Sequence, residues 1–358
     1  MGSFFWRYKL TGILNVIFAR NRTSLVVLLF FLLAVLILLS ASMGYIEIGF
    51  FDIFKIIVSQ FPGISVGLDY MNETWPAIVM DVRLPRILTC TAVGAALSLS
   101  GVVFQGILLN PLADPYTLGV SAGAAFGACT AILLNLGAAF VSVPLFAFAG
   151  ACLTLLFVIF LSCTGNNSTA SLSSNNLILS GIIVAAILSA GISFLKYTAD
   201  EQVAIIIFWL MGSFASKTWM DVMVTALFLV VGLIVSLVFA RDLNLISLGE
   251  RSASSLGVDT KKVTLILLIT GSMLAAVSVS VSGIIGFVGL LVPHMVRFIT
   301  GPDNRALIPV AMLTGALLLL GADTITRAIL PHEIPIGILT ALIGGPVFCW
   351  IFKRGSIR

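Results

Sequence analysis

Two arginines in this sequence stand close enough to act as a pair on an acidic group. Arg83 and Arg86 flank Leu84-Pro85 just before an apolar run, and the proline restricts the backbone between them. A planar guanidinium can grip a carboxylate with two hydrogen bonds, so the chemistry offered is recognition rather than covalent catalysis. Arg327 follows Asp323 by four residues, a spacing that predicts an ion pair along one helix face.

Other catalytic and binding chemistry is sparse. The two histidines, His294 and His332, are isolated, and neither an HExxH motif nor a Cys/His cluster occurs. Residues 212–218 lack the glycine before Lys217 that a nucleotide-binding loop requires. The five cysteines lie in apolar runs, without a CxxC motif, and are expected to serve packing. We therefore expect no enzyme activity, no metal site and no cofactor in this chain.

Composition selects the fold class. Of the 358 residues, 59% are hydrophobic and only 9% are charged, against about 25% charged in a soluble domain. A soluble fold could not cover so much apolar surface. The apolar runs are continuous rather than alternating, which excludes a membrane β-barrel. The sequence therefore predicts an all-α polytopic membrane protein, whose net charge of +4 reflects membrane topology and not nucleic-acid binding.

Ten apolar stretches are long enough to span a membrane, at about 20 residues each. They cover roughly residues 25–43, 87–109, 116–138, 143–163, 177–195, 222–240, 263–282, 283–300, 306–330 and 334–352. The run 203–215 is too short to cross and is expected to be a re-entrant or half-buried helix. The uncharged run from residue 263 is too long for one crossing, and Ser282-Gly283 is its natural break.

Charge distribution predicts the orientation. With both termini in the cytoplasm, most of the 19 Lys and Arg residues fall on the inner side. The arginines at 83, 86 and 327 are outer exceptions. The expected organisation is a cytoplasmic N-terminus at 1–24, a single ten-helix domain at 25–352 and a cytoplasmic tail at 353–358, in the cytoplasmic (inner) membrane.

Buried carboxylates, which a stand-alone ion-coupled carrier would need, are nearly absent from the apolar runs. Gln105 is polar but uncharged.

A short pattern recurs at about half the chain length. Residues 98–111 and 280–293 both read S-x-S-G-x6-L-L-x-P, 182 positions apart. This spacing indicates two parallel repeats of five helices each.

The polar segment 242–262 is the longest on the inner side. Apolar and polar residues mix along it, and Gly249 and Gly257 can end helices. The pattern predicts short helices at the membrane face. From the residues alone it is either an ordinary amphipathic loop or a docking element for a cytoplasmic partner.

Several motifs in order resemble the FecCD family of importer permeases. They are RLPR at 83–86, GAALS at 94–98, NPLADP at 110–115, LGVSAG at 118–123, LGE at 248–250, GIIGFVGLLVPH at 283–294 with Arg297, PIG at 335–337 and GGPVF at 344–348. The resemblance covers about residues 80–352.

The resemblance implies a homodimer of ten-span subunits, with two cytoplasmic ATPase subunits that carry ATP and Mg and one extracytoplasmic substrate-binding protein. It implies that Arg83, Arg86 and Arg327 dock the binding protein. It also implies that the cytoplasmic segment couples to the ATPases, through Leu248, Gly249, Glu250, Ala253, Leu256 and Gly257. Residues Ser173, Ser174, Asn175 and Asn176 match a cytoplasmic gate, but without the arginine found in the cobalamin permease.

The function so implied is ATP-driven import of a metal chelate (ferric siderophore, haem or cobalamin) by alternating access. The alternatives are a permease of the same type for an oxyanion such as molybdate and, further away, a stand-alone secondary carrier. A multi-span membrane enzyme would need clustered His, Asp or Cys, which the sequence lacks.

Overall fold

The computed structural model describes residues 22–44, 46–60, 72–137, 139–163, 173–328 and 333–355, all of them helical or connecting segments. The long helices are α2 (Arg22–Ser42), α5 (Leu84–Ile107), α7 (Ala139–Cys163), α8 (Ser174–Thr198), α10 (Trp219–Val238), α13 (Thr260–Ser282), α15 (Asn304–Ala328) and α16 (Ile336–Gly355). The shorter ones are α3 (Phe50–Ser59), α4 (Trp75–Ala77), the π-helix η1 (Ile78–Arg83), the 3-10 helix η2 (Pro115–Leu118), α6 (Val120–Leu133), α9 (Val203–Leu210), α11 (Ala240–Ile246), α12 (Glu250–Ser255) and α14 (Val288–Thr300).

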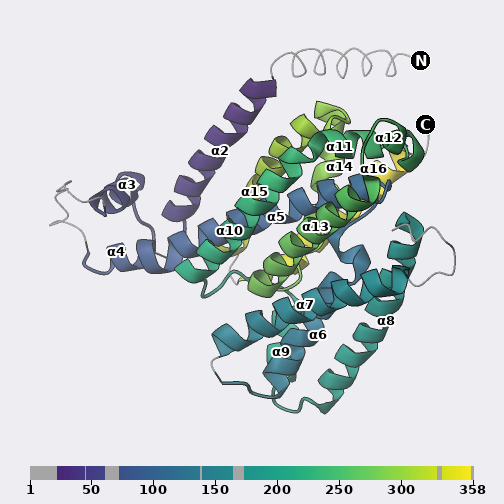
Figure 1. Ribbon diagram of the computed structural model, residues 1–358. Coiled ribbons are helices and arrows are strands. Elements are labelled where there is room, and N and C mark those ends of the chain that lie inside the picture. The colour runs from purple at the N-terminus through teal and green to yellow at the C-terminus, as the bar shows by residue number, and fades with distance from the viewer. Residues whose placement is uncertain are drawn as a thin grey trace.

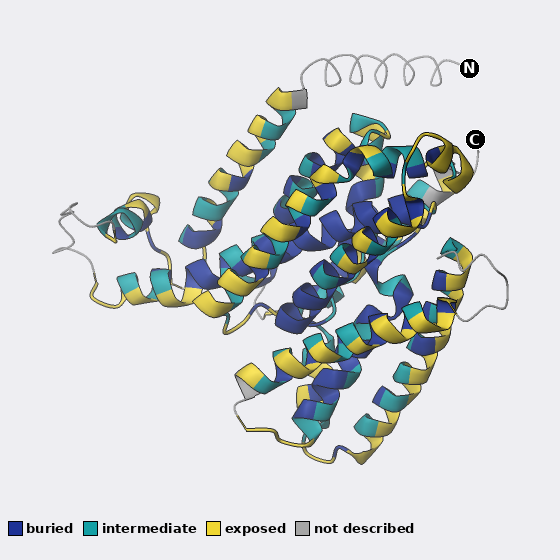
Figure 2. Ribbon diagram, viewed as in Figure 1, coloured by how far each residue is buried: buried dark blue, intermediate teal, exposed yellow. Residues whose placement is uncertain are grey.

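Helix α5 is the centre of the molecule. It packs against α10, α13, α14 and α15 (Figure 1), and 21 of its 24 residues are buried. Figure 2 shows the contrast with α2 and α8, which expose much of their apolar surface. In water such surface would be a liability, whereas in a bilayer it is the lipid-facing or subunit-facing side.

Helices α6, α7, α8 and α9 form a second group beside this core (Figure 1). Gly123 of α6 and Gly150 of α7 meet backbone to backbone, which explains the run of small residues in α6. The group joins the core where α7 and α6 pack on α13.

Helix lengths fit a multi-pass membrane protein. Seven helices within the described segments are long and apolar enough to cross a membrane, and three apolar helices are shorter. Each of the ten expected stretches overlaps one of these helices. The break at Ser282-Gly283 is confirmed, because α13 ends there with Gly283 at φ +74°. The helix expected in 203–215, too short to cross the membrane, is α9, which runs from Val203 to Leu210 with Ile206 buried.

Two of the expected spans are shorter than the apolar runs indicated. In place of 116–138, the helix α6 has 14 residues, because Gly119 (φ +76°) separates it from η2. In place of 283–300, the helix α14 has 13 residues, because residues 283–287 form a non-helical connection that ends at Phe287 with φ +68°. Apolar loop residues are indistinguishable from helical ones in a hydropathy window.

The two copies of the repeated motif do not occupy matching places. Ser98 and Gly101 lie inside continuous α5, whereas Ser280 and Gly283 lie at the C-terminal end of α13. At this motif the expected equivalence of two halves is wrong, since the same residue types pack a helix interior in one copy and end a helix in the other.

Candidate functional site: the two polar ends of the helix bundle

Polar side chains gather at the two opposite ends of α5 and α15. We call the first the arginine end, which contains Arg83, Arg86, Arg327, Asp323 and Glu333. The second is the coupling end, which contains α11, α12 and the start of α15.

Arg83 is turned into the protein. Its side chain is only 5% exposed, and its guanidinium donates hydrogen bonds to the carbonyl oxygens of Ala41, Ser42 and Ile46. These oxygens lie at the end of α2 and in the connection to α3. The arginine expected on an exposed surface therefore fixes α2 against the start of α5, because the free carbonyls of a helix end and its loop accept from it.

Arg327 has the same kind of partner. It donates to the carbonyl oxygen of Met43 at 2.8 Å, to the hydroxyl of Ser40 at 3.0 Å, and to the carbonyl oxygen of Ser40. Two arginines from α15 and η1 thus hold one short stretch of backbone at the end of α2.

Arg86 is held by two carboxylates of very different exposure. Its Nε and Nη2 donate to Asp323 at 3.1 and 2.9 Å, and its Nη1 donates to Glu333 at 3.1 Å. Asp323 is 1% exposed and Glu333 is 53% exposed. The expected pair of Asp323 with Arg327 is thus replaced by a pair across 237 positions of sequence, because α5 and α15 pack side by side.

Lys217 binds the connection between α9 and α10 to the end of α13. Its Nζ donates to the carbonyl oxygen of Val281 at 2.6 Å, near the C-terminal end of α13. Burial lowers the pKa of Lys217, while the nearby Asp221 acts in the opposite direction. The segment that was compared with a nucleotide-binding loop therefore caps a helix end.

At the coupling end, α11 and α12 form the short helices that the sequence predicted. Gly249 precedes α12 at φ +104°, and Gly257 follows it at φ +88°. Leu248 and Leu256 are more than 60% exposed, whereas Ala253 is fully buried. One face of the segment is thus anchored, and its two ends present apolar side chains outward.

Sequence reasoning missed the side chain that anchors α11. The amide of Asn244 donates to Asp303 at 2.8 Å and accepts from the backbone N–H of Asn304 at 2.9 Å. Asn304 is the first residue of α15, and Asp303 directly precedes it. No local pattern marks this contact, because its partners lie about 60 positions away.

A second amide bridges helices nearby. Gln105 donates to the carbonyl oxygen of Leu290 at 3.1 Å and accepts from Arg297 at 3.0 Å. Gln105, from the second apolar run, therefore joins α5 to α14.

The residues expected at a gate lie at the start of α8. Ser173 caps the helix by accepting from the N–H of Asn176, and Ser174 donates to the carbonyl oxygen of Ile107 at 3.3 Å. Asn175 and Asn176 are exposed. The two serines therefore have structural partners, and the two asparagines face outward.

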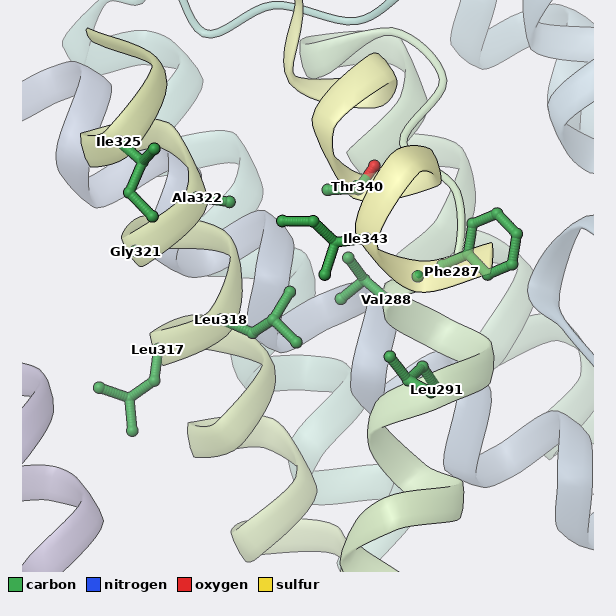
Figure 3. A pocket seen from close by; sticks show the side chains of 11 residues that line it. Phe287, Val288, Leu291, Leu317, Leu318, Gly321, Ala322, Ile325, Thr340 and Ile343 are labelled. Atoms are coloured by element: carbon green, nitrogen blue, oxygen red, sulfur yellow. The ribbon is translucent and has the colours of Figure 1, made fainter. Parts of the chain in front are cut away.

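An apolar pocket of about 290 Å³ lies between α14, α15 and α16. Figure 3 shows Leu317, Ile325 and Ile343 among its lining side chains, with Phe287 at its edge. Thr340 supplies the one hydroxyl group among the lining residues. A pocket of this composition suits an alkyl or aromatic group and offers nothing to hold an anion.

Within the described ranges, no three His, Cys, Asp or Glu side chains lie together so that they could hold a metal ion. His294 packs edge-on against Phe298, and His332 lies outside the described residues.

Comparison with known proteins defines the class. A solved structure described as an inward-facing metal-chelate type ABC transporter superposes with a TM-score of 0.80 at 33% identity, covering 93% of this chain and 99% of that one. The chain is the permease subunit of an ABC transporter and is a multi-pass membrane protein. The ATPase of such a transporter is a separate subunit. It belongs to the FecCD transport family, whose pattern matches residues 32–354.

Two relatives carry specific names. The cobalamin import system permease protein BtuC of Halobacterium salinarum is 43% identical over 80% of this chain and 76% of its own length. The hemin transport system permease protein HmuU of Yersinia pestis is 37% identical over 91% of this chain and 94% of its own length. Membership of the family therefore does not fix the compound, because these two relatives are named for the transport of different ones, cobalamin and hemin.

Proposed function

We propose that this chain is the permease of an importer that moves a metal chelate from an extracytoplasmic binding protein into the cytoplasm. The observation that carries the proposal is the match to a metal-chelate type transporter over nearly the whole of both chains. Two copies form the permease, with the arginine end outside and the coupling end and both termini inside. Two ATPase subunits bind at the coupling end.

Alternating access is the proposed mechanism. ATP-driven closure of the ATPases pushes on α11 and α12, and the hydrogen bonds of Asn244 pass this movement to α15. Asn175 and Asn176 are the proposed gate residues. Cargo selection rests mainly with the binding protein, because a tight site along the path would slow release.

Uptake assays decide the cargo. The permease, its ATPase and its binding protein are reconstituted in proteoliposomes and offered ferric siderophore, haem, cobalamin and molybdate in turn. We expect ATP-dependent uptake of one metal chelate. Uptake of molybdate alone would favour the oxyanion alternative, and ATP-independent uptake by the permease alone would contradict the proposal.

Gly249 should be required for coupling. A residue with a Cβ at φ +104° is strained, by roughly 1 kcal/mol, although nothing lies within 4 Å of that Cβ. We expect Gly249→Ala to leave the permease inserted but to lower ATP-driven transport severalfold. Gly301→Ala is the matched control, since Gly301 has φ +79° and equally open surroundings outside the α11–α12 segment. Equal transport by the two variants would show that the segment is not the coupling element.

Arg86 is the docking residue that we propose at the arginine end. Arg83 and Arg327 would have to leave their backbone carbonyls to reach a partner, so in this conformation they position the surface around Arg86. The double variant Arg86→Gln/Asp323→Asn removes both buried charges together and avoids an unpaired one. We expect it to bind the binding protein about five- to tenfold more weakly at low salt.

Lys55→Glu, on α3 at the same end, is the comparison variant for this measurement. It should change the affinity less than the double variant does. Unchanged affinity of the double variant in nanodiscs at low salt would contradict docking at Arg86.

A further inference from the structure

The two carboxylates on Arg86 cannot have the same role. Asp323 takes the Nε–Nη2 edge of the guanidinium with the two-bond geometry that favours this pairing. It is fully buried within the bundle. Glu333 meets only Nη1, and its two oxygens share this one nitrogen at 3.1 and 3.3 Å. Asp323 therefore fixes the position of Arg86, and Glu333 covers the part that faces outward.

Glu333 is also held near Arg86 by its place in the chain. Three residues later α16 begins, and its first turn is bonded to the α9–α10 connection. The N–H groups of Ile336 and Gly337 donate to the carbonyl oxygens of Gly212 and Met211 at 3.2 and 3.0 Å. The Glu333 carboxylate is thus tethered beside the guanidinium while more than half of its surface is in contact with solvent.

We infer that Glu333 is an internal stand-in for the carboxylate of the docked partner and that docking displaces it from Arg86. An incoming carboxylate can reach the guanidinium only at Nη1, because the other edge is buried against Asp323. The two acids carry the same charge and would repel each other at this one nitrogen. Docking is therefore an exchange of carboxylates, and the permease is protected against weak anions when no partner is bound. This inference rests on the proposed docking at Arg86.

The size of the effect follows from competition. An exposed ion pair is worth up to about 1 kcal/mol, so Glu333 occupies Nη1 most of the time. The apparent affinity for a partner falls by the fraction of permease in which Nη1 is free. Removing the competing charge should therefore tighten binding by about three- to sixfold at low salt.

The test measures binding of the ligand-loaded binding protein of the same importer to full-length permease in nanodiscs. Glu333→Gln should bind about three- to sixfold more tightly than the wild-type chain, and the gain should shrink at high salt, which screens both pairs. Glu47→Gln is the matched control, since Glu47 is an exposed acid in the α2–α3 connection, and it should leave affinity near the wild-type value.

The outcomes separate the two ideas. If Arg86→Gln/Asp323→Asn weakens binding but Glu333→Gln leaves it unchanged or weaker, the exchange is overturned and docking at Arg86 stands. If the double variant binds like the wild-type chain, docking at Arg86 fails and the exchange fails with it. A gain of equal size in Glu47→Gln would mark a general charge effect and would also overturn the exchange.

Discussion

Replacing Gly101 with alanine is expected to lower the apparent Tm of the purified permease more than any substitution at an exposed position. A Cβ atom on Gly101 would overlap the carbonyl oxygen of Gly289 and lie 2.7 Å from its carbonyl carbon. Both obstacles are backbone atoms of α14, so no side-chain rotation can make room. The helices α5 and α14 would have to separate, and overpacking of this kind costs about 1–3 kcal/mol or more.

Gly321→Ala is the control for Gly101→Ala. Gly321 lies inside α15, and nothing is within 4 Å of its Cβ position. Alanine favours a helix over glycine by roughly 1 kcal/mol, so the control should leave the apparent Tm unchanged or raise it. An unchanged Tm for Gly101→Ala, in the same detergent, would mean that α5 and α14 do not approach this closely.

Replacing Asp323 with alanine is expected to be the second large loss of stability. It removes the buried carboxylate that accepts hydrogen bonds from Nε and Nη2 of Arg86 and leaves that guanidinium with Glu333 alone. Breaking a buried ion pair on one side typically costs about 3–5 kcal/mol, and here the guanidinium would keep only the half-exposed Glu333 as a charged partner. Thermal unfolding in detergent should show a much lower apparent Tm.

Two further variants show whether the loss comes from the unpaired charge. Arg86→Met/Asp323→Leu replaces both partners with apolar groups and should recover much of the stability, since such replacements are often close to neutral. Glu333→Gln removes only an exposed partner and should shift the Tm little. If Asp323→Ala unfolds at the wild-type temperature, Asp323 does not hold Arg86 in place.

The features that the sequence predicted correctly are those that depend on short stretches of chain. Composition indicated the helical membrane class, the glycine after Ser282 marked a helix end, and leucine and glycine spacing located α11 and α12. These features follow from local backbone preference and from the apolar content of a window.

The sequence could not predict which polar groups meet. Arg83 donates to backbone carbonyl groups about 40 positions away. Every residue has such a carbonyl group, so the residue types do not reveal which of them an arginine will bind. Asp323 was expected to pair along its own helix, but the packing of α5 on α15 brought Arg86 closer. The lengths of α6 and α14 were overestimated because their flanking loops are as apolar as the helices.

One consequence of the position of α15 concerns mechanics. At 1.5 Å per residue its 25 residues extend about 37 Å, and polar bonds hold both of its ends, to Asn244 at one and to Arg86 at the other. A helix resists stretching because every turn is hydrogen-bonded. In α15 the ladder of hydrogen bonds is interrupted at Pro309, which lacks an N–H group and so removes one bond near the Asn244 end. The helix should therefore bend most easily there. Movement of α11 should therefore reach the arginine end as a tilt of residues 310–328 about a joint at Pro309, with a lever arm several times longer on the arginine side than on the other.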